Sequence, residues 1–261
     1  MTDFSFNEDE LAFYHEHGFL VREEVFSALE VARLQASVET AVQSAYDQTG
    51  GGRRYVLDGK RFVDVGSMTV QFEHTPGSET IRVIEPVQHL HEDLENLVTD
   101  ERIVEPIRSI LGGDISVWTN KLNLKRGYEG SGFGWHQDSP YWIHDSDHVD
   151  QLPNVYVAFD DATEANGCLR VIDRSHRQGC LPGTADGSQL GGFFTDPSCF
   201  DEHDAVSLPL TAGSMVFFDA HTVHGSNPNR TRYPRRAIVM TYQPAGYPML
   251  KTGEKIGRVH V

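Results

Sequence analysis

Length, composition and charge exclude several classes of protein before any motif is considered. The chain has 261 residues with 22 Lys and Arg against 38 Asp and Glu, and its formal net charge of -16 repels a phosphate backbone, so we expect no nucleic acid as a partner. It shows no apolar run long enough to cross a bilayer and no signal-peptide pattern at its start, so we expect no membrane partner and a cytoplasmic protein.

The cysteines and the absence of linkers indicate the domain organisation. Cys168, Cys180 and Cys199 are scattered and odd in number, which argues against a disulfide framework and a cysteine-based zinc site. We expect one domain over residues 1–261, with a helical N-terminal third over about residues 1–113 and a β core over about residues 114–245. The oligomeric state cannot be deduced from this pattern.

Three helices are expected in the first third. The stretch NEDELAFYHEHG has acidic residues in its first turn and ends at Gly18. The next helix begins with a capping box, Ser27 with Glu30 three residues later, and ends at the glycines 50–52. A third helix is expected in DERIVEPIRSILGG, where Pro106 should bend or delay it.

A basic cluster stands out between the second and third helices. Arg53, Arg54, Lys60 and Arg61 lie in a glycine-flanked segment of an otherwise acidic chain. One interpretation is a solvated loop or hairpin whose charges balance nearby carboxylates. The other is an anion-binding lid, which would make these four residues part of a substrate pocket.

Short strands are expected after Gly113. Runs rich in β-branched and aromatic residues alternate with Gly, Pro, Asn and Asp turns: ISVWTNKLNL, VYVAFD, CLRVI, AVSLPL, SMVFF and RAIVMTYQP. This spacing indicates a β barrel or sandwich with the helices packed outside it. The glycine-rich and acidic segment 183–204 is expected to be an insertion loop near the mouth of a pocket.

A pair of ligand-type residues in GFGWHQDSPYW suggests a metal site. His136 and Asp138 are two apart, so strand alternation would send both side chains to one face. With His224 far downstream they would form a set of two imidazoles and one carboxylate, which suits an iron(II) centre with open positions. Alone, the pair is weak evidence, because a histidine among aromatic residues is more often a satisfied core residue.

The surroundings of this pair carry a family resemblance. W-H-x-D, N-G-x-L-x-x-I-x-x-S-H, and H-G-S-x-x-N followed by R-R-A occur in this order. The sequence resembles the phytanoyl-CoA dioxygenase (PhyH) family of Fe(II)/2-oxoglutarate-dependent oxygenases, including its ectoine-hydroxylase-like branch. The resemblance implies an α+β, mainly β fold: a double-stranded β-helix, or jelly-roll and cupin-like core, with packed N-terminal helices.

The resemblance also implies roles for individual residues. The facial triad that holds Fe(II) falls on His136, Asp138 and His224, and the retained Asp138 indicates hydroxylation in preference to halogenation. The anchor of 2-oxoglutarate falls on Arg235, which could otherwise be a surface charge beside an outward-facing Arg236.

Four further positions complete the implied site. Ser226 would support the same carboxylate, and Asn123 would contact the 2-oxo-acid end, although it could equally be a strand-edge asparagine. Tyr141 and Trp142 would line the pocket, although a core tryptophan would give the same pattern.

The function implied is O2-dependent hydroxylation of an unactivated C–H bond, with 2-oxoglutarate converted to succinate and CO2. The basic cluster favours a small, polar or anionic metabolite as substrate. Alternatives are an acyl-CoA or carrier-tethered substrate, a zinc hydrolase with the same ligands, or a non-catalytic binding module on the same fold. The segment VIDRSH departs from the Pro-Gly turn common in the family, which affects only the expected loop geometry.

Overall fold

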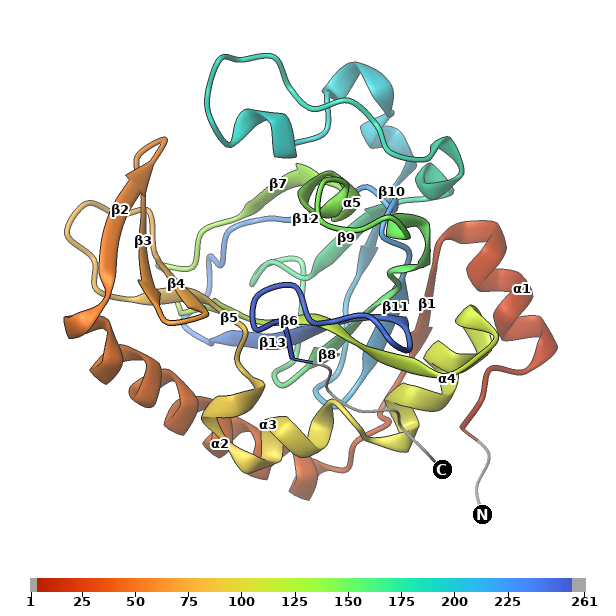
Figure 1. The fold of residues 1–261 in the computed structure, drawn as a ribbon, viewed down its shortest axis with the longest axis horizontal. Coiled ribbons are helices and arrows are strands. Elements are labelled where there is room, and N and C mark those ends of the chain that lie inside the picture. Colours follow the sequence, from red (N-terminus) through yellow and green to blue (C-terminus); the bar gives the residue numbers. More distant parts are fainter. Residues whose placement is uncertain (1–3, 255–261) are drawn as a thin grey trace.

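Two antiparallel β-sheets face each other at the centre of the molecule (Figure 1). This computed structural model describes residues 4–254. Within that range the larger sheet has nine strands, in the spatial order β1 (Phe19–Arg22), β11 (Met215–Phe218), β8 (Asn154–Ala158), β13 (Arg235–Pro244), β6 (Ile115–Lys125), β5 (Ile81–Glu85), β4 (Met68–Phe72), β3 (Lys60–Val65) and β2 (Arg53–Leu57). The smaller sheet has four described strands, in the order β10 (Ala205–Leu208), β9 (Leu169–Ile172), β12 (His224–Ser226) and β7 (Phe133–His136).

This double-layered arrangement is the jelly roll expected from the sequence. The strands predicted after Gly113 all form, and β13 pairs along its length with β6 at the centre of the larger sheet. Alternate residues of β6 point in opposite directions: Leu122 and Leu124 enter the main hydrophobic core, whereas Lys121 and Asn123 line a cavity between the sheets. The expectation of an α+β, mainly β fold is confirmed.

Helices cover the outer face of the larger sheet. α2 (Ala28–Gln48), α3 (Glu92–Leu97) and α4 (Glu101–Leu111) lie beneath it in Figure 1, and α1 (Glu8–His17) lies beside β1. The helix ends expected from the sequence are observed. Ser27 and Glu30 form a capping box at the start of α2, and Gly18 ends α1 with φ 80°. The remaining described helical segments are α5 (Ser139–Trp142) and the 3₁₀ turns η1 (Thr49–Gly51), η2 (Gln88–Leu90), η3 (Val149–Gln151), η4 (Ser175–Gln178), η5 (Gly191–Phe193), η6 (Pro197–Cys199) and η7 (Glu202–Asp204).

The delay that Pro106 was expected to impose on the third helix does not occur. α4 begins at Glu101 without delay, because the Asp100 side chain accepts a hydrogen bond from the Arg102 amide and caps the helix. Pro106 lies inside the helix and buries its ring. None of the helices in the described range 4–254 combines the length and the hydropathy that a membrane span requires.

The division into a helical third and a β core is wrong in its first part. Residues 53–85 form four strands, β2 to β5, that extend the larger sheet beyond β6. The β2–β3 hairpin turns at Asp58 and Gly59, which have φ 47° and 75° and pair Leu57 with Lys60. Asp-Gly with both φ angles positive is a two-residue hairpin turn that matches the strand twist. The hairpin interpretation of the basic cluster is therefore the correct local structure.

The strand extension generates a stability prediction. Ile84 of β5 is fully buried in the main core, between β4 and β6. Ile84→Ala should lower the free energy of unfolding by about 2 to 5 kcal/mol, because it removes buried methyl groups and leaves a cavity. Urea denaturation measures this change. Val56→Ala on the neighbouring hairpin is the control, since Val56 is 62% exposed and should cost less than about 1 kcal/mol. Equal losses in both variants would contradict the assigned packing.

Candidate active site

Pairing between β7 and β12 brings the two predicted histidine ligands together. His136 is the last residue of β7 and His224 the first of β12, and the antiparallel register places them directly opposite each other. Their ring centroids are 4.2 Å apart. Asp138 joins them, but not by strand alternation: it lies beyond β7 with φ -79° and ψ -30°, where the chain turns into α5. The predicted neighbours therefore meet through a strand-to-helix turn.

The three side chains leave one ligand atom each facing a common point. The potential ligand atoms of His136, Asp138 and His224 lie within 4.8 Å of one another, and all three residues are buried. Nδ1 of His136 donates to the Gly134 carbonyl at 2.8 Å, and Nδ1 of His224 to the Thr222 carbonyl at 2.9 Å. Each Nε2 therefore carries the free lone pair that a metal requires.

The Asp138 carboxylate is also oriented by a hydrogen bond that leaves one ligand atom free. Its Oδ1 accepts a hydrogen bond from the Lys121 ammonium at 2.9 Å, whereas its buried Oδ2 has no hydrogen-bond partner in the described chain. An unsatisfied buried carboxylate oxygen is costly unless a cation completes it. Two imidazole nitrogens and one carboxylate oxygen fit an octahedral divalent iron that keeps open positions for other ligands.

The protonation states also suit metal binding. Burial, and then the neighbouring His224, lower the pKa of His136 to about 3, and burial lowers the pKa of His224. Burial acts to raise the pKa of Asp138, but Lys121 and then the two histidines together outweigh burial and lower this pKa to about 2. Near pH 7 the site therefore presents two neutral imidazoles and one carboxylate, the forms that bind metal.

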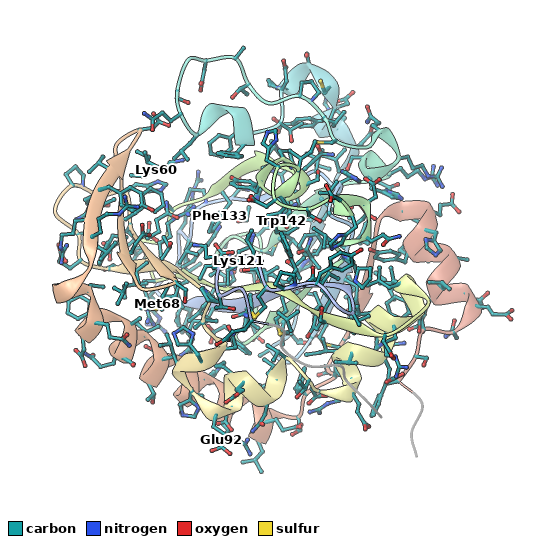
Figure 2. All side chains as sticks on the ribbon, in the orientation of Figure 1. Lys60, Met68, Glu92, Lys121, Phe133 and Trp142 are labelled. Carbon is teal, nitrogen blue, oxygen red and sulfur yellow. The ribbon has the colours of Figure 1, made fainter. Side chains whose placement is uncertain are left out.

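The ligand atoms face a cavity of about 370 Å³ between the two sheets. The figure with side chains shows Lys121, Phe133 and Trp142 together in this region, with Lys60 farther out on the β2–β3 hairpin (Figure 2). Among described residues, the cationic side chains that line the cavity are Lys60, Arg82, Lys121, Arg235 and Lys251, against the carboxylates Glu85 and Asp138. Positive groups therefore predominate in the cavity of a strongly acidic chain.

Arg235 lies in the wall of this cavity, at the start of β13. It is 2% exposed, donates from Nη1 to the Tyr156 hydroxyl at 3.1 Å, and has no described partner for its Nε. Arg236 points to the opposite side, where it pairs with Asp160 and Glu39. The expected division of the two arginines between inner and outer faces is thus the observed one.

Asn123 and Ser226 line the same cavity. The Asn123 Oδ1 is buried without a described partner, so it is available to a bound molecule. The Ser226 hydroxyl accepts a hydrogen bond from Lys125 Nζ at 2.8 Å. Burial, and then Arg235 and Arg82, lower the pKa of Lys125 to about 5, so Lys125 is mainly an uncharged donor at pH 7.

The predicted pocket residues fall into two groups. Tyr141, Trp142 and Lys60 line the cavity, and the Tyr141 ring stacks on Phe193 at a centroid distance of 4.3 Å. Trp142 is almost completely buried, so it serves as pocket wall and core residue together.

The other members of the basic cluster do not reach the cavity. Arg53 is exposed on β2 and pairs with Asp64 at 2.7 Å. Arg61 donates to the Glu73 carbonyl at 3.1 Å, on the outside of the β3–β5 region. Arg54 is exposed on the same hairpin and is absent from the cavity lining. Their inclusion in the substrate pocket was wrong. The register places Arg54 and Arg61 on the hairpin face opposite Lys60, and Arg53, although on the Lys60 face, lies at the end of the hairpin far from the turn.

Sequence reasoning missed Lys121 and Arg82, which line the cavity, and Lys125, which contacts Ser226 of the lining. Lys121 and Lys125 follow the alternation of β6 through Asn123, so the period-two pattern K-L-N-L-K contains the signal that could have found them. Arg82 lies on β5, in a region that was expected to be helical or loop. It stacks on the Phe133 ring, 3.6 Å from the centroid.

Comparison with known proteins agrees with this geometry. A family model described as phytanoyl-CoA dioxygenase (PhyH) matches residues 14–237. An ectoine dioxygenase of Bordetella parapertussis is 32% identical over 254 residues, covering 90% of this chain and 74% of the relative. A methylphosphonate hydroxylase of Gimesia maris is 29% identical over 172 residues, covering 66% of this chain and 62% of the relative.

A solved structure shares the fold. EctD from S. alaskensis with bound Fe superposes with a TM-score of 0.71 at 24% identity, covering 100% of this chain and 89% of the other. The fold likeness, the family model and the identity to the Bordetella relative lead to one conclusion. The chain belongs to the phytanoyl-CoA dioxygenase (PhyH) family and is an Fe(II)- and 2-oxoglutarate-dependent dioxygenase.

Proposed function

We propose that this dioxygenase hydroxylates an unactivated C–H bond of a small, polar metabolite that carries an anionic group. Iron(II) would be bound by His136, Asp138 and His224, and 2-oxoglutarate by Arg235. One observation carries the proposal: three unpartnered ligand atoms and an incompletely paired, buried guanidinium face the same cavity.

The chain's own groups prepare the metal end of the cavity. The Gly134 and Thr222 carbonyls fix the orientation of the two imidazoles, and Lys121 fixes the carboxylate. When bound, Fe(II) and 2-oxoglutarate supply the oxidising chemistry that inserts one atom of O2 into a C–H bond, with release of succinate and CO2. The aromatic walls keep bulk water away from the reacting carbon.

The opposite wall suits a dicarboxylate cosubstrate. Arg235 has no carboxylate partner in the described chain, so its charge is available to the distal carboxylate of 2-oxoglutarate. Ser226 supplies a hydroxyl to the same carboxylate, and Lys125 holds that hydroxyl in place. Asn123 supplies an amide to the 2-oxo-acid end.

Cavity size and charge support the substrate class. A volume of about 370 Å³ that must also hold the cosubstrate is at the small end for ligand sites, which favours a compact metabolite over an acyl chain. The predominance of cationic groups in the lining favours an anion. Ectoine and methylphosphonate, in the names of two relatives, are both small molecules that carry an acidic group.

The proposed setting is the cytoplasm. Cys168, Cys180 and Cys199 are free, as thiols remain in a reducing compartment. Iron in the Fe(II) state also requires reducing conditions.

The proposed reaction can be tested directly. Anaerobic protein is loaded with Fe(II) and 2-oxoglutarate and exposed to O2 with pools of metabolites, and succinate is measured. We expect a pool of small anions or zwitterions to stimulate succinate release above the substrate-free rate. Stimulation by CoA thioesters alone would contradict the proposed substrate class, and no release under any condition would contradict the assigned cofactor use.

Removal of one metal ligand should abolish metal-dependent stabilisation. Ni(II), which does not support turnover, should raise the Tm of the wild-type protein, because it binds only the folded site. His224→Ala removes one of the three converging ligand atoms and should eliminate this shift. The matched control is His203→Ala, an exposed histidine in η7 that is not part of the cluster, which should retain the full shift. An unchanged shift in His224→Ala would place the metal elsewhere.

Loss of the cavity arginine should weaken cosubstrate binding selectively. Arg235→Gln should raise the KM for 2-oxoglutarate by about 10- to 100-fold, because a buried charge-assisted hydrogen bond is lost. Steady-state succinate assays measure this effect. Arg236→Gln is the control: it breaks the pairs with Asp160 and Glu39 and should lower Tm, but leave the KM near the wild-type value. Equal KM increases in both variants would contradict the assignment of Arg235.

A further inference from the structure

The β2–β3 hairpin closes over the cavity by contact with the long loop of residues 183–204. Both oxygens of the Asp58 carboxylate, at the hairpin tip, accept backbone hydrogen bonds from this loop. The Gln189 amide donates to Oδ1 at 3.2 Å, and the Leu190 amide to Oδ2 at 2.6 Å. Leu190 and Phe194 of the loop line the cavity. The two segments, distant in sequence, therefore form its outer end together.

Lys60 is the cation that this hairpin carries to the outer end. It follows the Asp58-Gly59 turn directly, lies half-buried, and places its ammonium 4.7 Å from the centroid of the Phe194 ring. Figure 2 shows Lys60 on the hairpin, beside the loop. Within residues 4–254 its ammonium makes no hydrogen bond or ion pair, so its charge is not neutralised by a contacting carboxylate.

The other cations of the cavity are already engaged. Lys121 donates to Asp138 at 2.9 Å, and Lys251 lies 3.7 Å from Glu85 and donates to a threonine hydroxyl at 2.8 Å. Arg82 donates to two side-chain oxygens and one carbonyl. Arg235 belongs to the cosubstrate end. Outside the cosubstrate end, Lys60 is thus the cavity cation, among those described, whose N–H donors all remain free for a substrate.

The electrostatics at this end agree with a missing anion. Burial, and then the charges of Arg82 and Lys60, lower the pKa of His74 to about 4. Burial, and then Arg82, also lower the pKa of Lys60 itself, and Asp58 opposes this only in part. Three nitrogen-bearing side chains from β3, β5 and the β4–β5 connection therefore share this region. Among the described residues, Glu73 and Asp58 act on Arg82 and Lys60 respectively, but neither carboxylate forms an ion pair with them. An anion placed there would be stabilised.

We propose that Lys60 is a specificity-determining residue that binds the anionic group of the substrate at the outer end of the cavity, while the reacting carbon lies at the metal end. This inference rests on the proposed function and names the group that selects its substrate class. Phe194 and the Asp58 contacts hold the ammonium in position, so little ordering is required when the anion binds.

Calorimetry on unreactive complexes tests this inference. Protein loaded with Ni(II) and 2-oxoglutarate is titrated with methylphosphonate, ectoine and acetate, and with neutral acetamide for comparison. The wild-type protein should bind at least one of the probes that carry a carboxylate or phosphonate more tightly than acetamide. Lys60→Met should weaken that binding by about 10- to 100-fold, because one charge-assisted hydrogen bond is lost, and Lys60→Arg should restore most of it.

Arg53→Met is the matched control. It removes one positive charge from the same hairpin, but from an exposed side chain that pairs with Asp64 outside the cavity, so anion affinity should not change. Equal affinity in Lys60→Met and wild type, equal losses in the Lys60 and Arg53 variants, or no preference of the wild type for any probe that carries a carboxylate or phosphonate would each overturn the inference. Succinate release by the wild type tests the proposed function separately.

Discussion

The antiparallel register between β7 and β12 is the constraint on which the rest of the site depends. It sets His136 opposite His224, and a one-residue slip would send one imidazole to the outer face of the sheet. The register is reinforced beyond the strands, because the amides of Asp138 and Ser139 both donate to the Ala220 carbonyl. The segment after β7 is thereby tied to the segment before β12. All three ligand-type side chains are thus positioned by backbone hydrogen bonds.

Charge balance explains why such a cluster is stable without distorting the core. A buried carboxylate is costly unless it is paired, and Lys121 satisfies one oxygen of Asp138 while leaving the other free. Asp138 and Glu85 in turn raise the pKa of Lys121, although burial acts to lower it. The pair keeps one oxygen oriented toward the histidines. One oxygen of Asp138 is therefore paired with Lys121, and the other remains available to a metal.

The sequence predicts much of this molecule where local physics decides. Helix caps such as Ser27, the strands after Gly113 and the three ligand-type residues all follow from local patterns or ordered motifs. The sequence does not predict features that depend on contacts with residues distant in the chain. The conformation of Asp138 depends on a turn that Ala220 stabilises from 82 residues away in the chain, so strand alternation predicted the right neighbours for the wrong reason. Arg82 was missed because its strand forms only by pairing within an extended sheet.

The architecture separates the reaction from the choice of substrate. His136 and His224 belong to the paired strands β7 and β12, Asp138 follows β7 directly, and Arg235 begins β13 in the middle of the larger sheet, so the jelly roll fixes their positions. Lys60 instead belongs to a hairpin at the edge of the larger sheet, docked on a surface loop through Asp58. The hairpin makes its contacts at the outer end of the cavity, whereas the loop also pairs with β7 through the bridge between Phe194 and His136, so substitutions in the hairpin are the ones that leave the β7–β12 register untouched. A fold organised in this way can change the anion it selects while it keeps the same oxidative chemistry.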